Sequence, residues 1–379
     1  MILAVNKVYN SLLSIIISQF LSKKELDTRI KVSGLRCVPM KGEKLWKKRW
    51  ESLSKRINKD YYRFFSQYIG ESQDIVPDDI CHNVIETILN PHAFRGAVDD
   101  KNIFDILMAA RFKAPVTPVT LMRSIDGSLM DGAYNIISDV DDYLKGLLQD
   151  RIIAKPTFDS SSGQGVMLFE RNKNGKYEDK NNHLPLTCDV LIMNVGRNYV
   201  LQECLEQSDF MSDFCSTAVN TIRVATYRSV ETNEVHVLNS IMRIANNGSY
   251  VDNAHAGGCF IGVYKDGSLG KYLCNQYGEK ITIFNGIDFE HTDFKVPNIE
   301  EVWNFSKKVA SCVPHMRLLQ LDVAIDKEGT PRLIEYNLRA FSPWLYQFTT
   351  GPAFGQFTEE IVEYCKKHRK EANRVVVSF

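Results

Sequence analysis

The stretch that decides the fold reads Leu319-Gln320-Leu321-Asp322-Val323-Ala324-Ile325, then Asp326-Lys327-Glu328-Gly329-Thr330-Pro331, then Arg332-Leu333-Ile334-Glu335-Tyr336-Asn337-Leu338-Arg339. Two alternating runs joined by a turn rich in Asp, Gly and Pro predict a β-hairpin. Side chains alternate between the two faces of a strand. The first strand therefore has one apolar face, formed by Leu319, Leu321, Val323 and Ile325, and places Asp322 on the other.

The second strand of this hairpin carries the other polar side chains. Strict alternation places Leu333, Glu335 and Asn337 on one face and Ile334 and Tyr336 on the opposite face. A register can be drawn that brings Asp322 close to Glu335 and Asn337. Two carboxylates and an amide oxygen form an all-oxygen site that suits Mg²⁺ better than Zn²⁺. The alternative is an ordinary solvated hairpin face.

The composition is that of an ordinary globular protein. The 379 residues are enough for two or three domains, and 46 basic residues balance 46 acidic ones, so no overall field favours nucleic acid. The nine cysteines include no Cys-x-x-Cys pair. They indicate a reducing cytoplasm and neither a disulfide framework nor a zinc site.

The N-terminal segment is apolar at first and then basic. Its opening residues are interrupted by polar side chains and lack a cleavage site, so we predict an amphipathic helix and not a signal peptide or a membrane span. From Lys23 to Arg63 there are 14 basic and five acidic residues. An apolar stripe at helical spacing runs through this region, formed by Trp46, Trp50, Leu53 and Ile57.

Two interpretations of residues 1–63 stay open. The stripe can pack on the body of the protein while the charges are solvated. Alternatively, the segment contacts an anionic membrane surface or a lipid-linked substrate. The first helix has a further possible partner, a second protomer in a homo-oligomer.

A second motif lies upstream of the hairpin. A strand ending in Lys155 precedes a Ser/Gly loop, residues 157–165, and another strand follows the loop. Small residues with exposed N–H groups and hydroxyls can surround phosphate oxygens, and Lys155 supplies a positive charge. This is not a Walker loop, because the lysine precedes the glycines and no helix follows. The alternative is a plain hairpin turn.

Polar residues between these motifs suggest further contacts. Residues 199–209 form a strand that breaks into a polar segment able to offer backbone groups to a purine and a carboxylate to a ribose. Later strands carry Arg223 and Arg243, and Tyr227 shares the face of Arg223. Each arginine has either a salt-bridge partner or an anion, which is a substrate carboxylate or a transferring phosphate. His255 lies in a following glycine-rich loop.

The order of these motifs resembles the ATP-grasp superfamily. More closely, Asn220-Thr221-x-Arg223, Val251-Asp252-Asn253, Gly257-Gly258 and Asp322…Glu335-x-Asn337 resemble the sugar-transfer-associated ATP-grasp family of polysaccharide biosynthesis. The resemblance implies an α+β fold with two lobes that clasp ATP. Three divisions follow: a helical, basic region at 1–98, a smaller first lobe at 99–200, and a second lobe with the metal site at 201–379. ATP-grasp ligases commonly carry a Rossmann-like lobe in front of the grasp, and this chain departs from that pattern.

The resemblance also implies roles for individual residues. Asp322, Glu335 and Asn337 would hold two Mg²⁺, Arg243 would face the γ-phosphate and the developing intermediate, and Arg223 would act in catalysis and substrate binding. Other expected substrate contacts are Asp252, Asn253 and Arg339. The expected ATP contacts are Lys101, Lys155, Ser160, Ser161, Ser162, Gly163, Gln164, Gly165, Gln202, Glu203, Leu205, Glu206 and Asp209.

The function implied is an ATP-dependent carboxylate–amine ligase. It would form an acyl phosphate and then an amide, joining an amino acid or amine to a sugar acid that is free, nucleotide-linked or lipid-linked in capsule or O-antigen synthesis. His255 or Asp252 is a candidate base for the amine. Two alternatives are a kinase acting on a hydroxyl group and a nucleotide-binding scaffold for glycosyltransferases.

Overall fold

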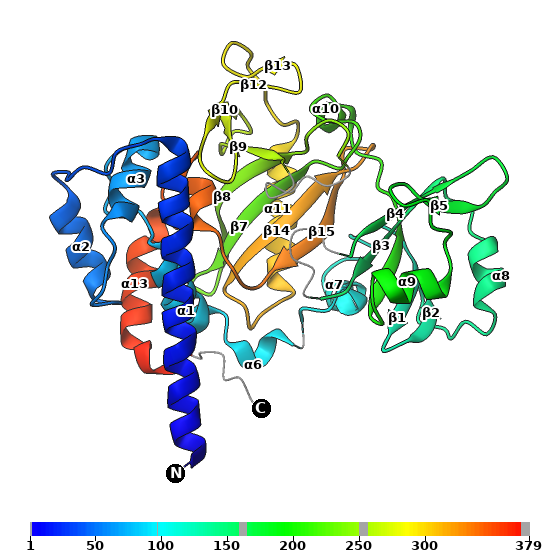
Figure 1. Cartoon of the computed structure of the whole chain (residues 1–379), viewed down its shortest axis with the longest axis horizontal. Helices are drawn as coiled ribbons and strands as arrows, with labels where there is room; N and C mark the ends of the chain where they lie inside the picture. The colour runs from blue at the N-terminus through cyan, green and yellow to red at the C-terminus, as the bar shows by residue number, and fades with distance from the viewer. Residues whose placement is uncertain (1, 97, 159–164, 250–256, 373–379) are drawn as a thin grey trace.

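The computed structural model describes residues 2–96, 98–158, 165–249 and 257–372, with the backbone alone for residues 2–16. Figure 1 shows two antiparallel sheets side by side, with a group of helices at the far side of the larger sheet. The fold class predicted from the sequence, α+β with a helical N-terminal region, is confirmed.

The first sheet has six strands in the order β2-β1-β6-β3-β4-β5. Their bounds are Thr120–Ile125 (β1), Ser128–Asp131 (β2), Arg151–Pro156 (β3), Met167–Arg171 (β4), Tyr177–Asp179 (β5) and Tyr199–Glu203 (β6). Helices α8 (Val140–Lys145) and α9 (Cys188–Asn194) lie beside this sheet. Along β3, Ile152 and Ala154 enter the core of this sheet, so the alternating residues Ile153 and Lys155 face the other side.

The second sheet has seven strands in the order β11-β10-β9-β8-β7-β14-β15. Their bounds are Thr221–Arg228 (β7), Val235–Ile244 (β8), Cys259–Val263 (β9), Leu269–Cys274 (β10), Lys280–Ile281 (β11), Leu318–Ile325 (β14) and Pro331–Asn337 (β15). Helix α11 (Ile299–Ser311) packs against β7, β8, β14 and β15. The apolar face predicted for β14 lies in the core beneath α11.

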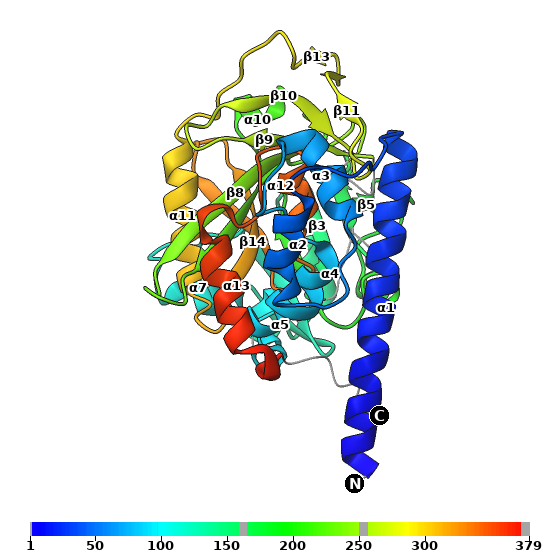
Figure 2. The ribbon, with the colours of Figure 1, turned by 90° about the vertical axis from the view of Figure 1, so that its left-hand side faces the viewer.

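The N-terminal helices cover the opposite side of the second sheet (Figure 2). They share one hydrophobic core with strands β7 to β10 and with the C-terminal helices. The elements on this side are α1 (Ile2–Ser33), α2 (Glu43–Glu51), α3 (Asp60–Ile69), α4 (Asp78–Ile80), a π-helical turn (Cys81–Ile85), α5 (Glu86–Leu89), α12 (Pro343–Gln347) and α13 (Thr358–Lys367).

The shorter elements connect these parts. They are α6 (His92–Arg95), a 3₁₀ turn (Lys101–Ile103), α7 (Phe104–Ala109), α10 (Asp209–Ser212), the small hairpin of β12 (Ile283–Phe284) and β13 (Ile287–Asp288), and 3₁₀ turns at Gly355–Phe357 and Arg369–Glu371.

The aromatic stripe of α2 packs on the body of the protein. Trp46 and Trp50 are fully buried, and their indole N–H groups donate to the carbonyls of Ile75 (2.7 Å) and Gln73 (3.2 Å). The helix ends at Glu51, so the predicted continuation to Ile57 is wrong. Serine hydroxyls bond the main chain there, including Ser52 Oγ to the Arg49 carbonyl at 2.9 Å, and such bonds compete with a helix.

The sequence also predicts a strand around Val116 to Met122 and a helix over residues 138–148, and the bounds of both differ in the structure. The strand expected from Val116 begins only at Thr120, because Pro118 has no N–H to give to a ladder. The helix expected over residues 138–148 is confined to α8. Asp139 caps its start by accepting from the Asp142 N–H at 3.0 Å, and the helix ends before Gly146.

The predicted faces of β15 are partly wrong because the strand contains a β-bulge. Asp322 pairs with Glu335, but Val323 pairs with Leu333, which leaves Ile334 as the extra residue. Leu333 and Tyr336 therefore both enter the core, although strict alternation separates them. Ile334 lines the same cavity as Glu335 and lies away from the core.

Candidate active site

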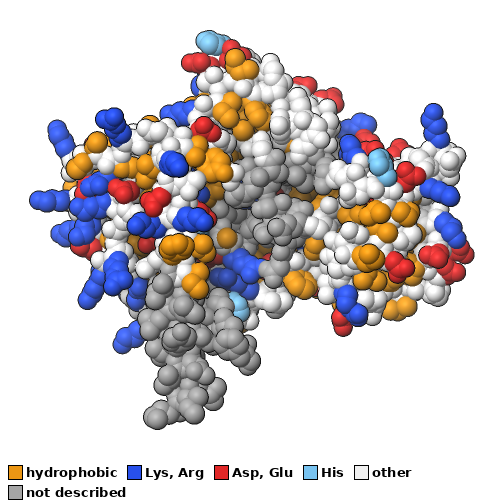
Figure 3. Space-filling model, viewed as in Figure 1, with side chains coloured by type: hydrophobic (Ala, Val, Ile, Leu, Met, Phe, Trp, Pro, Cys, Tyr) orange, Lys and Arg blue, Asp and Glu red, His pale blue; other side chains and the backbone are white. Residues whose placement is uncertain are grey.

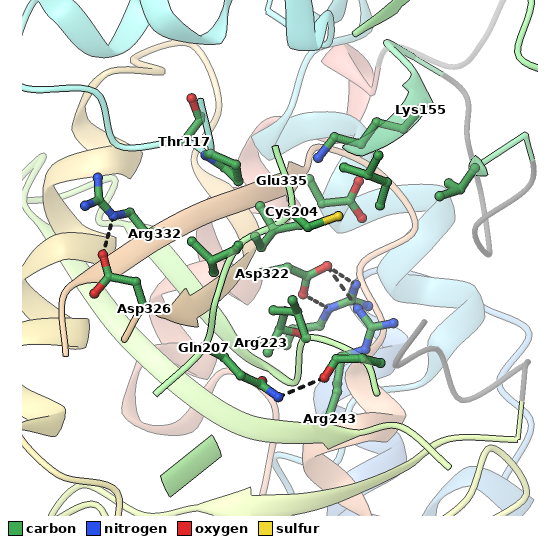
Figure 4. Close-up of a pocket in the computed structure, with 18 of the residues that line it drawn as sticks. Thr117, Lys155, Cys204, Gln207, Arg223, Arg243, Asp322, Asp326, Arg332 and Glu335 are labelled. Atoms are coloured by element: carbon green, nitrogen blue, oxygen red, sulfur yellow. Dashed lines mark hydrogen bonds and ion pairs between the residues drawn. The ribbon is translucent and has the colours of Figure 1, made fainter. Parts of the chain in front are cut away.

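A cavity of about 920 Å³ lies between the two sheets. Its walls come from β3 and β4 of the first sheet, from β7, β8, β14 and β15 of the second, and from the segment after β6 (Figure 4). The predicted site residues that line it are Lys101, Lys155, Glu203, Leu205, Glu206, Arg223, Arg243, Asp322, Glu335, Asn337 and Arg339.

The hairpin brings the three candidate metal ligands together. Asp322 on β14 lies directly opposite Glu335 on β15, and Gln320 lies opposite Asn337. The Asn337 amide donates to the Gln320 carbonyl at 3.3 Å, which orients its side chain. The predicted register is confirmed, and it places these oxygen-bearing side chains on the cavity side.

Asp322 is paired with both arginines. It is buried, and it accepts from Arg223 Nε (2.7 Å) and Nη2 (2.6 Å) and from Arg243 Nη1 (3.1 Å). Burial alone would raise the pKa of Asp322, but Arg223 and Arg243 outweigh it and lower that pKa to about 2. Burial alone would lower the pKa of Arg223, whereas Asp322 raises it above its ordinary value.

Two lysines approach the carboxylates from the other side. Lys101, in the 3₁₀ turn before α7, places Nζ 3.4 Å from Glu335 Oε2. Lys155 on β3 points toward the same region in Figure 4. Burial, assisted by the charge of Lys101, lowers the pKa of Lys155 to about 8. This end of the cavity therefore gathers five cations (Lys101, Lys155, Arg223, Arg243 and Arg339) around two carboxylates.

The cavity lining also includes apolar residues that the sequence analysis missed. Ile153 and Leu168 come from β3 and β4, and the bulge adds Ile334 from β15. Ile153 was predictable, because it lies two residues before Lys155 on the same strand face. Ile334 was not, because only the bulge exposes it to the cavity.

The predicted ATP contacts at the end of β6 and in the segment after it are only partly as expected. Glu203, Leu205 and Glu206 line the cavity, and Glu206 pairs with Lys327 at 2.9 Å. Gln202 is buried and does not line the cavity: its amide donates to the Pro118 carbonyl (3.3 Å) and to Thr120 Oγ1 (3.1 Å). Asp209 begins α10 outside the cavity lining.

Several of the predicted site residues lie outside the described ranges. They are the phosphate-loop residues Ser160, Ser161, Ser162, Gly163 and Gln164, the expected substrate contacts Asp252 and Asn253, and the candidate base His255. Gly165 is described, with a positive φ of 72°, and is followed by Val166 in the cavity lining.

The family of the chain follows from its sequence together with this arrangement. Residues 83–362, more than half of the chain, match the family described as sugar-transfer associated ATP-grasp. The chain belongs to the sugar-transfer associated ATP-grasp family. No curated protein matches it in sequence.

Solved structures similar to this ATP-grasp protein include three enzymes. The L-amino acid ligase from Bacillus licheniformis is 14% identical with a TM-score of 0.39, over 70% of this chain and 47% of that chain. D-cycloserine synthetase is 13% identical with a TM-score of 0.41, over 73% of each chain. The D-alanine–D-alanine ligase from Bacillus anthracis is 13% identical with a TM-score of 0.37, over 73% of this chain and 69% of that chain. The chain thus spans about half the length of the L-amino acid ligase.

The donor set of this ATP-grasp protein is compatible with Mg²⁺. Among the residues described, no group of three or more His, Cys, Asp or Glu side chains could hold a metal by itself. Asp322, Glu335 and Asn337 offer two carboxylates and one amide, all oxygen donors on one wall. Mg²⁺ is commonly held by one or two carboxylates together with substrate phosphates, so a complete protein cage is not required.

Proposed function

We propose that this ATP-grasp protein is an ATP-dependent ligase that joins a carboxylate to an amine through an acyl phosphate. One observation carries the proposal: Lys101 and Lys155 face Asp322 and Glu335 across a single cavity. Arg223 and Arg243 lie beside these carboxylates. An excess of cations at that end fits a polyphosphate. The apolar lining residues Ile153, Leu168 and Ile334 fit the purine of ATP.

The chain's own residues then have distinct tasks. Lys101 and Lys155 would neutralise phosphate oxygens, and Arg243 would stabilise the charge that develops on the transferring phosphoryl group. Asp322, Glu335 and Asn337 would hold Mg²⁺, which would supply further neutralisation of the phosphates. A carboxylate oxygen of the substrate attacks the γ-phosphorus and releases ADP. The amine then attacks the acyl carbon, which forms the amide and releases phosphate. The amine nitrogen gives its proton to a base in this step.

Catalysis of this kind depends on position and charge and not on a nucleophilic side chain. Arg339 lies at the same end of the cavity and is a candidate carboxylate contact together with Arg223. The cavity wall also contains Phe260, Trp344 and Leu345. An aromatic and aliphatic wall next to arginines suits a ring that bears a carboxylate, and we therefore propose a sugar acid as one substrate and an amino acid or amine as the other.

The structure gives less support to a kinase. A kinase needs a carboxylate that is available to accept a hydroxyl proton next to the γ-phosphate. Asp322 is held by two arginines, and Glu335 lies within ion-pair distance of Lys101.

The experiment is an ADP-release assay with MgATP over a panel of uronic acids, free and nucleotide-linked, and amino acids, with and without hydroxylamine. Hydroxylamine traps an acyl phosphate as a hydroxamate. We expect carboxylate-dependent ADP release with hydroxamate formation, and no release by Asp322→Asn. ADP release with a stable phosphorylated hydroxyl product and no hydroxamate would replace the ligase by the kinase.

A further inference from the structure

Helix α1 extends past the rest of the molecule at its N-terminal end (Figures 1 and 2). Its C-terminal half is anchored to the body: Leu26 enters the core, and the buried Arg29 pairs with Asp78 at 3.0 Å. The guanidinium of Arg29 also lies 4.6 Å above the ring of Trp344. Among the described side chains, Leu26 is the first of α1 to enter that core. The helix is thus held firmly at one end.

The side chains just before the anchored half are apolar and exposed. Ile17, Phe20 and Leu21 are 49%, 64% and 51% exposed. They are three and four residues apart, so they share one face of the helix. By sequence, residues 2–21 contain one charged side chain, Lys7. An exposed apolar face of this kind needs a partner.

The segment that follows this face along the chain is basic. Of the 14 basic residues between Lys23 and Arg63, five pair with carboxylates: Arg29, Lys47, Arg49, Lys59 and Arg63. The other nine are exposed and have no ion pair within the part of the chain that the structure describes: Lys23, Lys24, Lys31, Arg36, Lys41, Lys44, Lys48, Lys55 and Arg56. Figure 3 shows Lys and Arg side chains gathered on the side of the molecule formed by α1 and α2.

We propose that α1 and this basic surface dock the protein on an anionic membrane. Ile17, Phe20 and Leu21 would enter the boundary between headgroups and acyl chains, and the nine free cations would contact anionic headgroups. Charge favours this occupant over a second copy of the chain, because two copies meeting here would bring their unpaired cations together. Among the described residues, no helix is long and apolar enough to cross a membrane.

The test is co-sedimentation of the full chain with vesicles of phosphatidylcholine, with or without phosphatidylglycerol. We expect binding only to vesicles that contain phosphatidylglycerol, and weaker binding as salt is raised. The apolar variant Ile17→Ser/Phe20→Ser/Leu21→Ser and the charge variant Lys44→Glu/Lys48→Glu/Lys55→Glu should each lower the bound fraction about tenfold.

Matched control variants carry their substitutions in the first lobe, which does not contact the membrane in this proposal. Ile136→Ser/Leu148→Ser/Met193→Ser changes three apolar side chains that are more exposed than those of α1, and Lys145→Glu/Lys173→Glu/Lys176→Glu reverses the same number of charges. Both should bind like the wild type. The proposal is overturned if neither vesicle binds the protein, or if the controls lose as much binding as the α1 and α2 variants. It is also overturned if light scattering shows a dimer that the apolar variant dissociates and no vesicle binding accompanies it.

Discussion

Arg223 holds Asp322 through two parallel hydrogen bonds, from Nε to Oδ1 at 2.7 Å and from Nη2 to Oδ2 at 2.6 Å. The two residues lie directly opposite each other on β7 and β14. Arg243 donates a third bond to the same carboxylate. Both oxygens of Asp322 are therefore occupied by guanidinium groups, and a metal bound by Asp322 would share it with these arginines.

This pairing predicts a loss of stability in acid. The pKa of Asp322 is about 2 in the folded protein against an ordinary value of 3.8. The contribution of Asp322 to the free energy of unfolding is about 2 kcal/mol. It is fully present above about pH 4 and is lost as the pH falls toward about 2. Urea unfolding at several pH values in this window measures it.

Asp322→Asn isolates this contribution from that of other carboxylates. The variant leaves Arg223 and Arg243 without a counter-charge, so it should be about 3–5 kcal/mol less stable near neutral pH. It should also depend less on pH than the wild type between about pH 4 and about pH 2. Parallel pH dependences of the two proteins would contradict the assigned pairing.

Glu335→Gln tests the metal assignment. The change keeps the size of the side chain and removes its charge, so we expect the Mg²⁺ concentration for half-maximal ADP release to rise by about 10- to 100-fold. The control is Glu206→Gln, which removes a carboxylate from the same cavity where it pairs with Lys327. An unchanged Mg²⁺ requirement in Glu335→Gln would remove this residue from the metal site.

The sequence predicted the acidic hairpin because its signals are local. Alternation and turn residues determine the strands, and the Asp322–Glu335 register was found as drawn. The bulge at Ile334 could not be predicted from the sequence, because no residue at that position requires a bulge. Leu333 and Tyr336 both enter the core because of tertiary packing, which a local pattern does not contain. The contribution of Ile334 to the cavity lining was missed for that reason.

The N-terminal region shows a second limit of the sequence. Trp46 and Trp50 at helical spacing left both packing and membrane contact open, since both bury an apolar face. The structure buries these residues in a core shared with Tyr227 and Phe260 of the second sheet. Such a contact joins segments far apart in the chain, and no local pattern contains it.

Asn90 links the N-terminal helices to the strands that carry the site. Its amide donates to the carbonyls of Leu318 (2.6 Å) and Leu338 (2.9 Å), and its oxygen accepts from the N–H groups of Arg317 and Leu318, both at 3.0 Å. Asn90→Ala leaves these buried backbone groups without partners, so the free energy of unfolding, measured in urea, should fall by about 2–4 kcal/mol. Asn174→Ala, at an exposed turn, is the control and should lie within about 0.5 kcal/mol of the wild type.

Lys155 should make ATP binding depend on pH. Its pKa of about 8 means that it carries its charge near neutral pH and loses it above pH 8, because burial and Lys101 disfavour the charged form. If the protonated lysine contacts the phosphates, the Kd for MgATP should rise about tenfold for each pH unit above 8. Calorimetric titrations at several pH values measure this, and Lys155→Arg should flatten the profile because a guanidinium keeps its proton. Lys327→Arg, in the same cavity, should keep the wild-type profile. An equally steep profile in Lys155→Arg would assign the titration to another group.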